Sequence, residues 1–569
     1  MLAVDLVVVF LSVIYRYVLN NPLQWTDEIG RALLVALTFL GGAAALSRRQ
    51  HMGVVALTSR LRGRPLAFVE SAVIWIVLIF AVVFLWFSAQ FLRASFDQTT
   101  ASGLSQAIFF IPMTVSAAAM VFHAVAAFSR SDRRSVVIAA LTITTCGLIW
   151  WAWGVVFPGT RPAPFAVMLI GFVIALVLSV PVGFALGISS LLFLWTKGGI
   201  NMQIIPNRME AGVDNFVLLA IPFFVLAGFI MEVSGMSGHL VNVVSLIVGR
   251  LRGGLGIVMI ISMYLFSGIS GSKTADVTAV GSFLIPTMRK ERYTGGEAVS
   301  ILAASAAMGE TVPPSLAIII LGYTANLSIS GLFIAGILPA AAIAVLLMLV
   351  AFVSAPARVE QARKPRRTRR EITGMIIGAL LALLVPVMIL GGILKGIATP
   401  TEISGFAVVY ALCVAWFVYR NVGFAKTVKL FVESAVLSGM ILFIVATASL
   451  VGWILTAEGI PQSLARTMIA ISAHGGTWVF LVLSVLVLIL MGSVLEGGPA
   501  LIIFGPLLVP IAAKLGVNPL HYGIVLIIAM GIGLFSPPIG IGLYTACAVG
   551  GVSVEQASRP LLKYLERVA

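Results

Sequence analysis

Apolar stretches long enough to cross a bilayer recur along almost the whole chain, and short polar loops separate them. In the first 160 residues they predict transmembrane helices at about 3–19, 29–47, 66–92, 103–128 and 135–157. A second, longer apolar block starts near residue 163 and is interrupted once, at 357–370. The pattern predicts an all-α polytopic membrane protein. Met1 leads into the first span without a basic region or a cleavage site, so we predict no signal peptide; the span looks shortened, which leaves open a start upstream of Met1.

Basic residues gather in alternate loops. The loop 20–28 has none, the segment 48–64 has five arginines, the loop 93–102 has one and the segment 130–134 has three. Because short cytoplasmic loops accumulate Lys and Arg, this pattern places both ends of the first four spans on the cytoplasmic side. The same rule makes 357–370, with seven basic residues, a cytoplasmic loop.

Composition narrows the class of protein further. Of the 569 residues 60% are apolar, against roughly 45 to 50% in soluble domains. The net charge of +15 does not indicate nucleic-acid binding, because the basic residues lie in short loops between spans. The three cysteines and five histidines lack the spacing of a metal site or a catalytic group. We therefore expect neither an enzyme nor an organic cofactor.

The long apolar block contains an internal repeat with an offset of 224 residues. Gly309 falls on Gly533, and the pair Pro313-Pro314 falls on Pro537-Pro538. A proline pair removes two backbone donors and disfavours the α conformation in the residue before it, so a helix cannot run straight through. Each half is therefore predicted to contain a broken helix. Unwound backbone at membrane depth is buried in protein or lines a polar cavity, where its carbonyls can bind a cation.

A second polar break precedes each proline pair. It reads SGISGSKTAD at 267–276, and its repeat partner reads MGSVLEGGPA at 491–500. Lys273 and Asp276 lie three positions apart in the first break, close enough to pair if that segment is helical. A charged side chain at bilayer depth costs at least about 2.5 to 3.5 kcal/mol, so these charges are expected to be paired or functional.

Three segments resemble a known family, the tripartite ATP-independent periplasmic (TRAP) transporters, in the form whose small and large membrane subunits are fused. Residues 271–322, which include GSKTADVTAVG and GETVPPS, resemble the first signature of the large subunit. Residues 505–544, which include GLFSPPIG, resemble the second signature. Residues 16–52 are similar to the small subunit's signature, an arginine followed by Trp-x-acid-acid.

The resemblance implies a domain organisation and a function. It implies a four-helix small-subunit scaffold (1–134), a connecting helix and loop (135–162), and a transport domain of two inverted repeats with broken-helix hairpins (163–356 and 372–569), joined by the basic loop 357–371. The implied function is Na+-coupled, elevator-type import of a small organic acid, a carboxylate or related anion. The resemblance also implies that a periplasmic substrate-binding protein delivers the acid to this multi-pass protein in the phospholipid bilayer of the bacterial inner membrane, with Na+ as the coupling ion and no other metal.

Carried over by position, the family's site residues fall mainly in the breaks. Those that the resemblance places at the substrate are Ser272, Lys273, Thr274, Asp276, Pro313, Pro314 and Ser315. Those that it places at sodium, held largely by backbone carbonyls, are Gly271, Ser272, Gly309, Thr311, Gly492, Gly533, Ser536 and Pro537. Structural residues at the small-subunit face, or simple packing and interfacial anchors, are Arg16, Trp25, Asp27 and Glu28.

Lys273 departs from the family pattern, because many members have serine there. Three interpretations are open: Lys273 neutralises Asp276, contacts a substrate carboxylate, or stands in for one sodium ion. Asp27 also replaces a frequent glutamate, which is a conservative change.

Two other transport functions compete with the tripartite importer. A stand-alone sodium/dicarboxylate symporter would need neither a binding protein nor the four-span block. A channel would let the substrate equilibrate without accumulation, whereas repeated broken helices fit alternating access better. The residues do not select one organic acid.

Overall fold

The structure, a computed structural model, describes residues 1–48, 50, 61–156, 162–249, 251–270, 273–355, 368–495, 497–536 and 540–565. In this described part the regular structure is helical, and eleven helices are long and apolar enough to cross a membrane, or twelve if one bent pair counts as a single span. The predicted all-α polytopic fold is confirmed.

Packing divides the chain into two compact units. The first comprises Met1–Val8, Tyr15–Phe216 and Ala435–Ile460, and the second comprises Val9–Ile14, Val217–Ser434 and Pro461–Ala569. The first unit thus combines most of the four-span block with the start of the long apolar block and with a helix segment from its second half. The domain boundaries predicted from the sequence stay a prediction.

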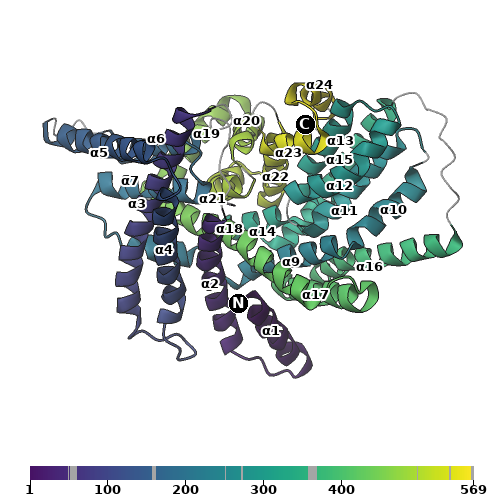
Figure 1. Ribbon diagram of the computed structural model, residues 1–569, viewed down its shortest axis with the longest axis horizontal. Coiled ribbons are helices and arrows are strands. Elements are labelled where there is room, and N and C mark those ends of the chain that lie inside the picture. The colour runs from purple at the N-terminus through teal and green to yellow at the C-terminus, as the bar shows by residue number, and fades with distance from the viewer. Residues whose placement is uncertain are drawn as a thin grey trace. The chain divides into compact units, whose positions relative to one another are not determined.

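The helices before residue 216 include all five predicted spans, with ends within four residues of those expected. They are α1 (Leu2–Val13), continued by a π-helix (Ile14–Val18), α2 (Trp25–Ser47), α3 (Arg64–Ser95), α4 (Ala107–Phe128), α5 (Arg133–Val156), α6 (Pro164–Val177), α7 (Val182–Lys197) and α8 (Ile204–Ala211). Helix α2 begins four residues earlier than predicted, at Trp25, because Asp27 and Glu28 suit the first turn of a helix, where the macrodipole favours acidic side chains. Helices α3 and α4 lie side by side (Figure 1).

An aromatic core holds the first unit together. It consists of Phe39 from α2, Phe80 and Phe84 from α3, Phe184 from α7 and Phe443 from α18 (Phe424–Ala457), all fully buried. Neighbouring ring centroids are 5.3 to 6.3 Å apart, within the range in which aromatic rings attract one another. The core therefore joins α2 and α3 of the four-span block directly to α7 and α18 of the long block.

Glycines let α2 and α18 cross closely beside this core. A Cβ atom at Gly41 would lie 2.7 Å from the carbonyl oxygen of Ala435 and 2.9 Å from the Cα atom of Gly439. Because both obstacles are backbone atoms, we predict that Gly41→Val forces the helices apart and destabilises the protein by about 1 to 3 kcal/mol. Thermal unfolding in detergent measures this against Gly147→Val in α5, where a Cβ meets nothing within 4 Å. Equal melting temperatures for the two variants would disprove the close crossing.

The remaining helices follow the repeat. Those of the first half are α9 (Ala220–Val233), α10 (Met236–Val248), α11 (Gly254–Ser270), α12 (Lys273–Lys290), α13 (Gly295–Met308), a 3₁₀ turn (Gly309–Thr311), α14 (Leu316–Thr324) and α15 (Ile329–Val353). Those of the second half are α16 (Arg369–Leu394), α17 (Pro400–Cys413) with a π-helix (Val414–Tyr419), α18, α19 (Ile460–Gly475), α20 (Thr477–Val494), α21 (Gly497–Lys514), α22 (Pro519–Phe535), α23 (Ile541–Gly550) and α24 (Val554–Leu565). The offset of 224 carries both ends of α12 onto both ends of α21.

Helix α13 lies at the centre of the second unit. Every residue from Ala298 to Met308 is buried, and the helix packs against α11, α12, α15, α22, α23 and α24, several of which surround it in Figure 1. Small side chains, such as those of Ala303–Ala307, let so many neighbours approach.

The helix breaks occur where the proline pairs predict them. In the first repeat, α13 and its 3₁₀ turn end before Pro313-Pro314, and α14 continues at an angle of 41°. In the second repeat, α22 ends at Phe535 and α23 begins at Ile541; Pro537 and Pro538 lie outside the described residues.

Candidate functional site at the broken helices

The predicted pair of Lys273 and Asp276 is present at the start of α12. Lys273 Nζ lies 3.9 Å from Asp276 Oδ2, which is too long for a hydrogen bond. Ser267 at the end of α11 donates from Oγ to the same carboxylate oxygen over 3.4 Å. A cation at a helix N-terminus is disfavoured by the macrodipole, and the Lys273 side chain is only 11% exposed. The positive charge of Lys273 therefore needs nearby carboxylates to stabilise it.

A second carboxylate, that of Glu310, belongs to the same site. It lies in the 3₁₀ turn after α13, is 8% exposed, and has no hydrogen-bond partner for its Oε2 atom among the described residues. The Lys273 ammonium acts on it electrostatically. Our sequence analysis did not single out this residue, although an acid three residues before a proline pair in an apolar block carries the same signal that identified Lys273.

The start of α21, which belongs to the second repeat, lies next to the Glu310 carboxylate. A Cβ atom at Gly497, the first residue of α21, would lie 3.2 Å and 3.3 Å from the two carboxylate oxygens of Glu310. The Glu310 carboxylate therefore lies close to the start of α21 and interacts electrostatically with Lys273 at the start of α12. The repeat offset relates Gly497 to Lys273, so these two helix starts are equivalent. We call Lys273, Asp276 and Glu310 the charge cluster. Glu496, bonded to Gly497, lies outside the described residues.

Close packing accounts for three predicted glycines. Gly309 allows Ser267 to approach the 3₁₀ turn, because a Cβ there would overlap the serine side chain. Gly492 of α20 and Gly533 of α22 face each other where their helices cross, and a Cβ at Gly492 would lie 2.7 Å from the Met530 carbonyl oxygen. These glycines keep the backbone of the breaks close together.

The hydroxyl groups at the two proline breaks donate to their own helices. Thr311 Oγ1 donates to the Met308 carbonyl over 2.6 Å, and Ser536 Oγ donates to the Ile532 carbonyl over 2.6 Å. Their oxygen atoms keep lone pairs that a cation could use. Ser315 is buried at the start of α14, directly after the buried prolines Pro313 and Pro314.

Three predicted site residues, Gly271, Ser272 and Pro537, lie outside the described residues. Thr274 is in the first turn of α12, where the backbone alone is described. The structure therefore brings together Lys273, Asp276 and Gly309, and adds Glu310 and Ser267 to them.

The predicted small-subunit residues lie in the first unit. Glu28 accepts hydrogen bonds from the backbone N–H of Ser102, over 3.1 Å, and from the Ser102 hydroxyl, and so holds the loop between α3 and α4. Trp25 is 41% exposed at the start of α2, Asp27 is in the same turn, and Arg16 lies in the π-helix after α1. An interfacial or scaffold role for these residues stays a prediction.

An ion pair that the sequence did not predict ties α2 to the segment after α8. Arg31 Nη1 lies 2.8 Å and 2.7 Å from the two carboxylate oxygens of Asp214. The Arg31 guanidinium also lies 6.0 Å from the centre of the Phe109 ring. Nothing in the local pattern around Asp214 distinguishes it from an ordinary loop acid.

Glu210, at the end of α8 and outside the candidate spans, gives a pH-dependent prediction. Burial raises the pKa of Glu210 to about 7, with a further rise from Asp214 and opposition from Arg31. A raised pKa favours the protonated carboxyl in the folded state, so this contribution to stability is complete below about pH 4.5 and is lost as the pH rises through 7. The loss is on the order of 1 to 3 kcal/mol.

Glu210→Gln, which resembles the neutral acid, should remove that pH dependence. The measurement is thermal unfolding in detergent at pH 5 and pH 8. The melting temperature of the variant minus that of the parent should be larger at pH 8 than at pH 5. An identical difference between the two proteins at both pH values would show that Glu210 does not titrate in this range.

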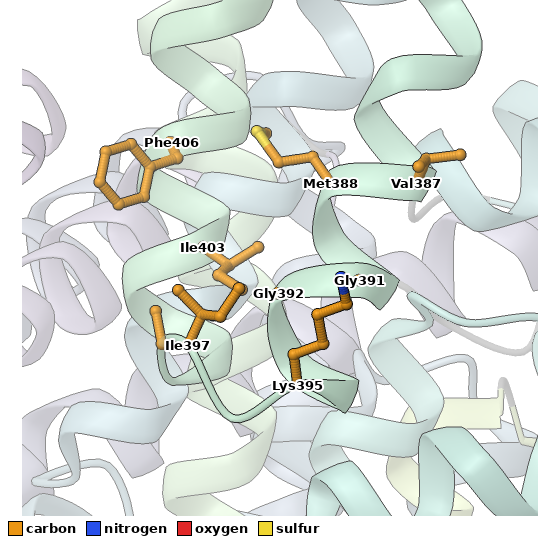
Figure 2. A pocket seen from close by; sticks show the side chains of 9 residues that line it. Val387, Met388, Gly391, Gly392, Lys395, Ile397, Ile403 and Phe406 are labelled. Carbon is orange, nitrogen blue, oxygen red and sulfur yellow. The ribbon is translucent and has the colours of Figure 1, made fainter.

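A separate apolar cavity of about 320 Å³ lies between the end of α16 and the start of α17 (Figure 2). Its lining includes Met388, Gly392, Lys395, Ile397, Ile403 and Phe406. Lys395 supplies the one charged group of this lining, and no predicted site residue belongs to it. An anionic substrate needs several polar partners to leave water, so this cavity is not our candidate transport site.

Comparison with known proteins identifies the family of the four-span block and of the long block. Residues 169–568 match the family described as "Tripartite ATP-independent periplasmic transporter, DctM component", and residues 5–134 match the DctQ component of the same transporters. The isethionate TRAP transporter permease protein of Oleidesulfovibrio alaskensis is 30% identical over 99% of this chain and 89% of its own length.

Two large permease proteins are similar over the long block. That of a sialic acid TRAP transporter from Vibrio cholerae is 34% identical over 70% of this chain and 92% of its own length. That of a C4-dicarboxylate TRAP transporter from Pseudomonas aeruginosa is 35% identical over 67% of this chain and 88% of its own length. The chain therefore belongs to the TRAP transporters, with both membrane components in one polypeptide, and it is a multi-pass transporter of the bacterial inner membrane rather than an enzyme.

Proposed function

We propose that this protein uses an inward Na+ gradient to import a small organic acid delivered by a periplasmic substrate-binding protein. The observation that carries the proposal is the charge cluster at the breaks, where Glu310 of the first repeat lies against Gly497 of the second. Broken helices from two repeats that meet at buried polar groups are the arrangement in which secondary transporters bind their substrates. The relatives are named for isethionate, sialic acid and C4-dicarboxylates, which are all organic acids.

Backbone carbonyls at the breaks support a sodium site. Pro313 and Pro314 have no N–H, so α13 cannot supply its usual donors to the carbonyls of Gly309 and Glu310. The Val312 N–H donates to the Gly309 carbonyl over 3.1 Å instead. A carbonyl oxygen has two lone pairs, so one that accepts a single hydrogen bond can still bind a hard monovalent cation. The proposed sodium residues are those of the sequence prediction: Gly271, Ser272, Gly309, Thr311, Gly492, Gly533, Ser536 and Pro537.

In this proposal Lys273 contacts the acid group of the substrate. The ammonium is mostly buried and makes no hydrogen bond within the described residues, so its donors can serve an incoming anion. Ser272, Thr274, Asp276, Pro313, Pro314 and Ser315 complete the proposed substrate site. The helices that carry the breaks move as a body, in an elevator-type displacement, while the four N-terminal spans serve as a static scaffold.

The experiment that tests this proposal asks whether uptake requires the periplasmic substrate-binding protein. The periplasmic substrate-binding protein proposed as the partner is titrated with isethionate, sialic acid and succinate, and uptake of the acid that binds is measured in proteoliposomes. We expect uptake with the binding protein present and none without it. Equal uptake in its absence would favour the stand-alone symporter and would leave the four N-terminal spans without their proposed role.

A further inference from the structure

Two kinks in the chain occupy equivalent positions of the repeat. Helix α9 ends two residues before Gly235 and is followed by α10, and α18 ends two residues before Gly459 and is followed by α19. Both glycines have a left-handed backbone, with φ of 78° and 67°, and the repeat offset carries one onto the other. The N–H of each glycine donates to the carbonyl three residues earlier, over 3.0 Å and 3.1 Å. The two kinks therefore have similar backbone conformations, which glycine adopts without strain.

Each kink is held by a residue of the opposite repeat. Lys197, the last residue of α7, lies with its Nζ atom 2.8 Å from Oε1 of Glu458, directly before the second kink glycine. Asn421, two residues after the π-helix that continues α17, donates from Nδ2 to the carbonyl oxygen of Ser234, directly before the first kink glycine, over 2.8 Å. The repeat offset carries Lys197 onto Asn421 and Ser234 onto Glu458. We call these two interactions the kink contacts; each lies within one compact unit.

The kink contacts join the same two positions of the repeat with different chemistry. One is an ion pair between partly exposed side chains, and the other is a hydrogen bond from an amide to a backbone carbonyl. Similar residue types therefore do not account for the recurrence. The contact between these positions recurs although neither residue type is kept, which indicates a role for the position itself.

The kink contacts lie on opposite sides of the membrane. Helix α16, helix α17 with its π-helix, and helix α18 are consecutive candidate spans, and the loop before α16 is predicted to be cytoplasmic. The chain therefore passes to the periplasmic side in α16, returns in α17 and crosses again in α18. This count places Asn421 on the cytoplasmic side and Glu458 on the periplasmic side.

The helices that follow the kinks lead to the polar breaks. Helix α10 leads into α11, and α19 leads into α20; we call α10 and α19 the arm helices. The breaks at 267–276 and 491–500 lie at the ends of α11 and α20. Helix α10 packs against α9 and α16, and its His239 ring stacks on Tyr419 with the ring centroids 5.4 Å apart. This arm helix is therefore supported by helices outside the breaks.

We propose that Lys197 and Asn421 are positioning residues for transport: each holds, at one membrane face, the kink from which an arm helix leads to the break-carrying helices of the opposite repeat. This inference rests on the proposed elevator-type displacement and names two fixed points from which it takes place. A body that moves relative to the rest of a transporter is displaced fully only if its attachments stay in place. Neither residue belongs to the predicted site, so loss of a kink contact should slow turnover and leave the affinities for substrate and sodium unchanged.

Charge reversal tests the ion pair in proteoliposomes. In Lys197→Glu two carboxylates face each other, and we expect the maximal rate of uptake per folded protein to fall about 3- to 10-fold. The substrate and sodium concentrations for half-maximal uptake should not change. Glu458→Lys should have the same effect, and Lys197→Glu combined with Glu458→Lys should restore the rate. Lys429→Glu is the matched control, because Lys429 and Glu433 form another exposed pair on α18, 3.7 Å apart and away from the kink.

Hydrogen–deuterium exchange of the purified full-length protein tests the same contact without transport. The N–H groups of Glu458 and its kink glycine close the last turn of α18, so they should exchange faster in Lys197→Glu than in the parent, in sodium and in potassium alike. The charge swap should restore slow exchange. Asn421→Ala should give the corresponding increase at Ser234.

Three results would overturn the inference: exchange and transport of Lys197→Glu equal to those of the parent, a charge swap that does not restore the rate, or loss of folded protein with the parent's rate per molecule. A parent without sodium-driven uptake would instead refute the proposed function. The exchange rates would still decide whether Lys197 and Asn421 hold the two kinks.

Discussion

Replacing Lys273 by alanine is expected to raise the substrate concentration for half-maximal uptake about 10- to 100-fold, which corresponds to the roughly 1.5 to 3 kcal/mol of a charge-assisted contact. The sodium dependence of uptake should change little, because the proposed sodium ligands are backbone carbonyls. The ammonium lies at the start of α12, is mostly buried, and donates no hydrogen bond to another described residue. Initial rates of uptake over a range of substrate and sodium concentrations measure both effects.

Lys290→Ala is the matched control, because Lys290 is an exposed lysine at the opposite end of the same helix. It should leave both concentrations unchanged. If Lys273→Ala lowers only the yield of folded protein, Lys273 serves to neutralise Asp276 and does not bind substrate. A changed sodium-to-substrate ratio in Lys273→Ser would instead show that the ammonium stands in for a sodium ion.

Replacing both Pro313 and Pro314 by alanine should abolish most sodium-driven uptake. Alanine restores two N–H groups, so α13 can extend and bond the carbonyls of Gly309 and Glu310 that the prolines leave without helical donors. If one carbonyl ligand contributes about 1.4 kcal/mol to the free energy of sodium binding, its loss weakens sodium binding tenfold. The measurement is the sodium concentration for half-maximal uptake, together with the amount of folded protein.

Pro386→Ala is the control for this variant, since Pro386 lies inside the continuous helix α16. It should have normal sodium dependence. Normal sodium-driven uptake in the double alanine variant would show that the break after α13 has no part in ion binding.

Sequence patterns predicted the five spans before residue 160, because crossing a bilayer imposes a length and a composition that are visible locally. The repeat offset related the two polar breaks, and the structure shows that α12 and α21 begin at equivalent residues there. The proline pair marked the 41° bend after α13. Each of these features can be found in a single segment of the sequence or by aligning two segments.

Contacts between distant segments were not predictable in the same way. The approach of Glu310 to Gly497 joins residues of different repeats, and the ring contact between Phe184 and Phe443 joins helices far apart in the sequence. Both depend on tertiary packing, which hydrophobic periodicity does not specify. Glu310 was missed for another reason: its motif was interpreted as a source of backbone carbonyls, and its side chain was overlooked.

The measurement that tests the central claim most directly is accumulation of the transported acid in proteoliposomes containing the binding protein, with an inward sodium gradient or with potassium alone. Sodium-coupled import predicts that the internal concentration rises above the external one under the sodium gradient, and that collapse of the gradient reverses the accumulation. Flux that only equilibrates the acid, equally in sodium and in potassium, would contradict the account and favour a channel.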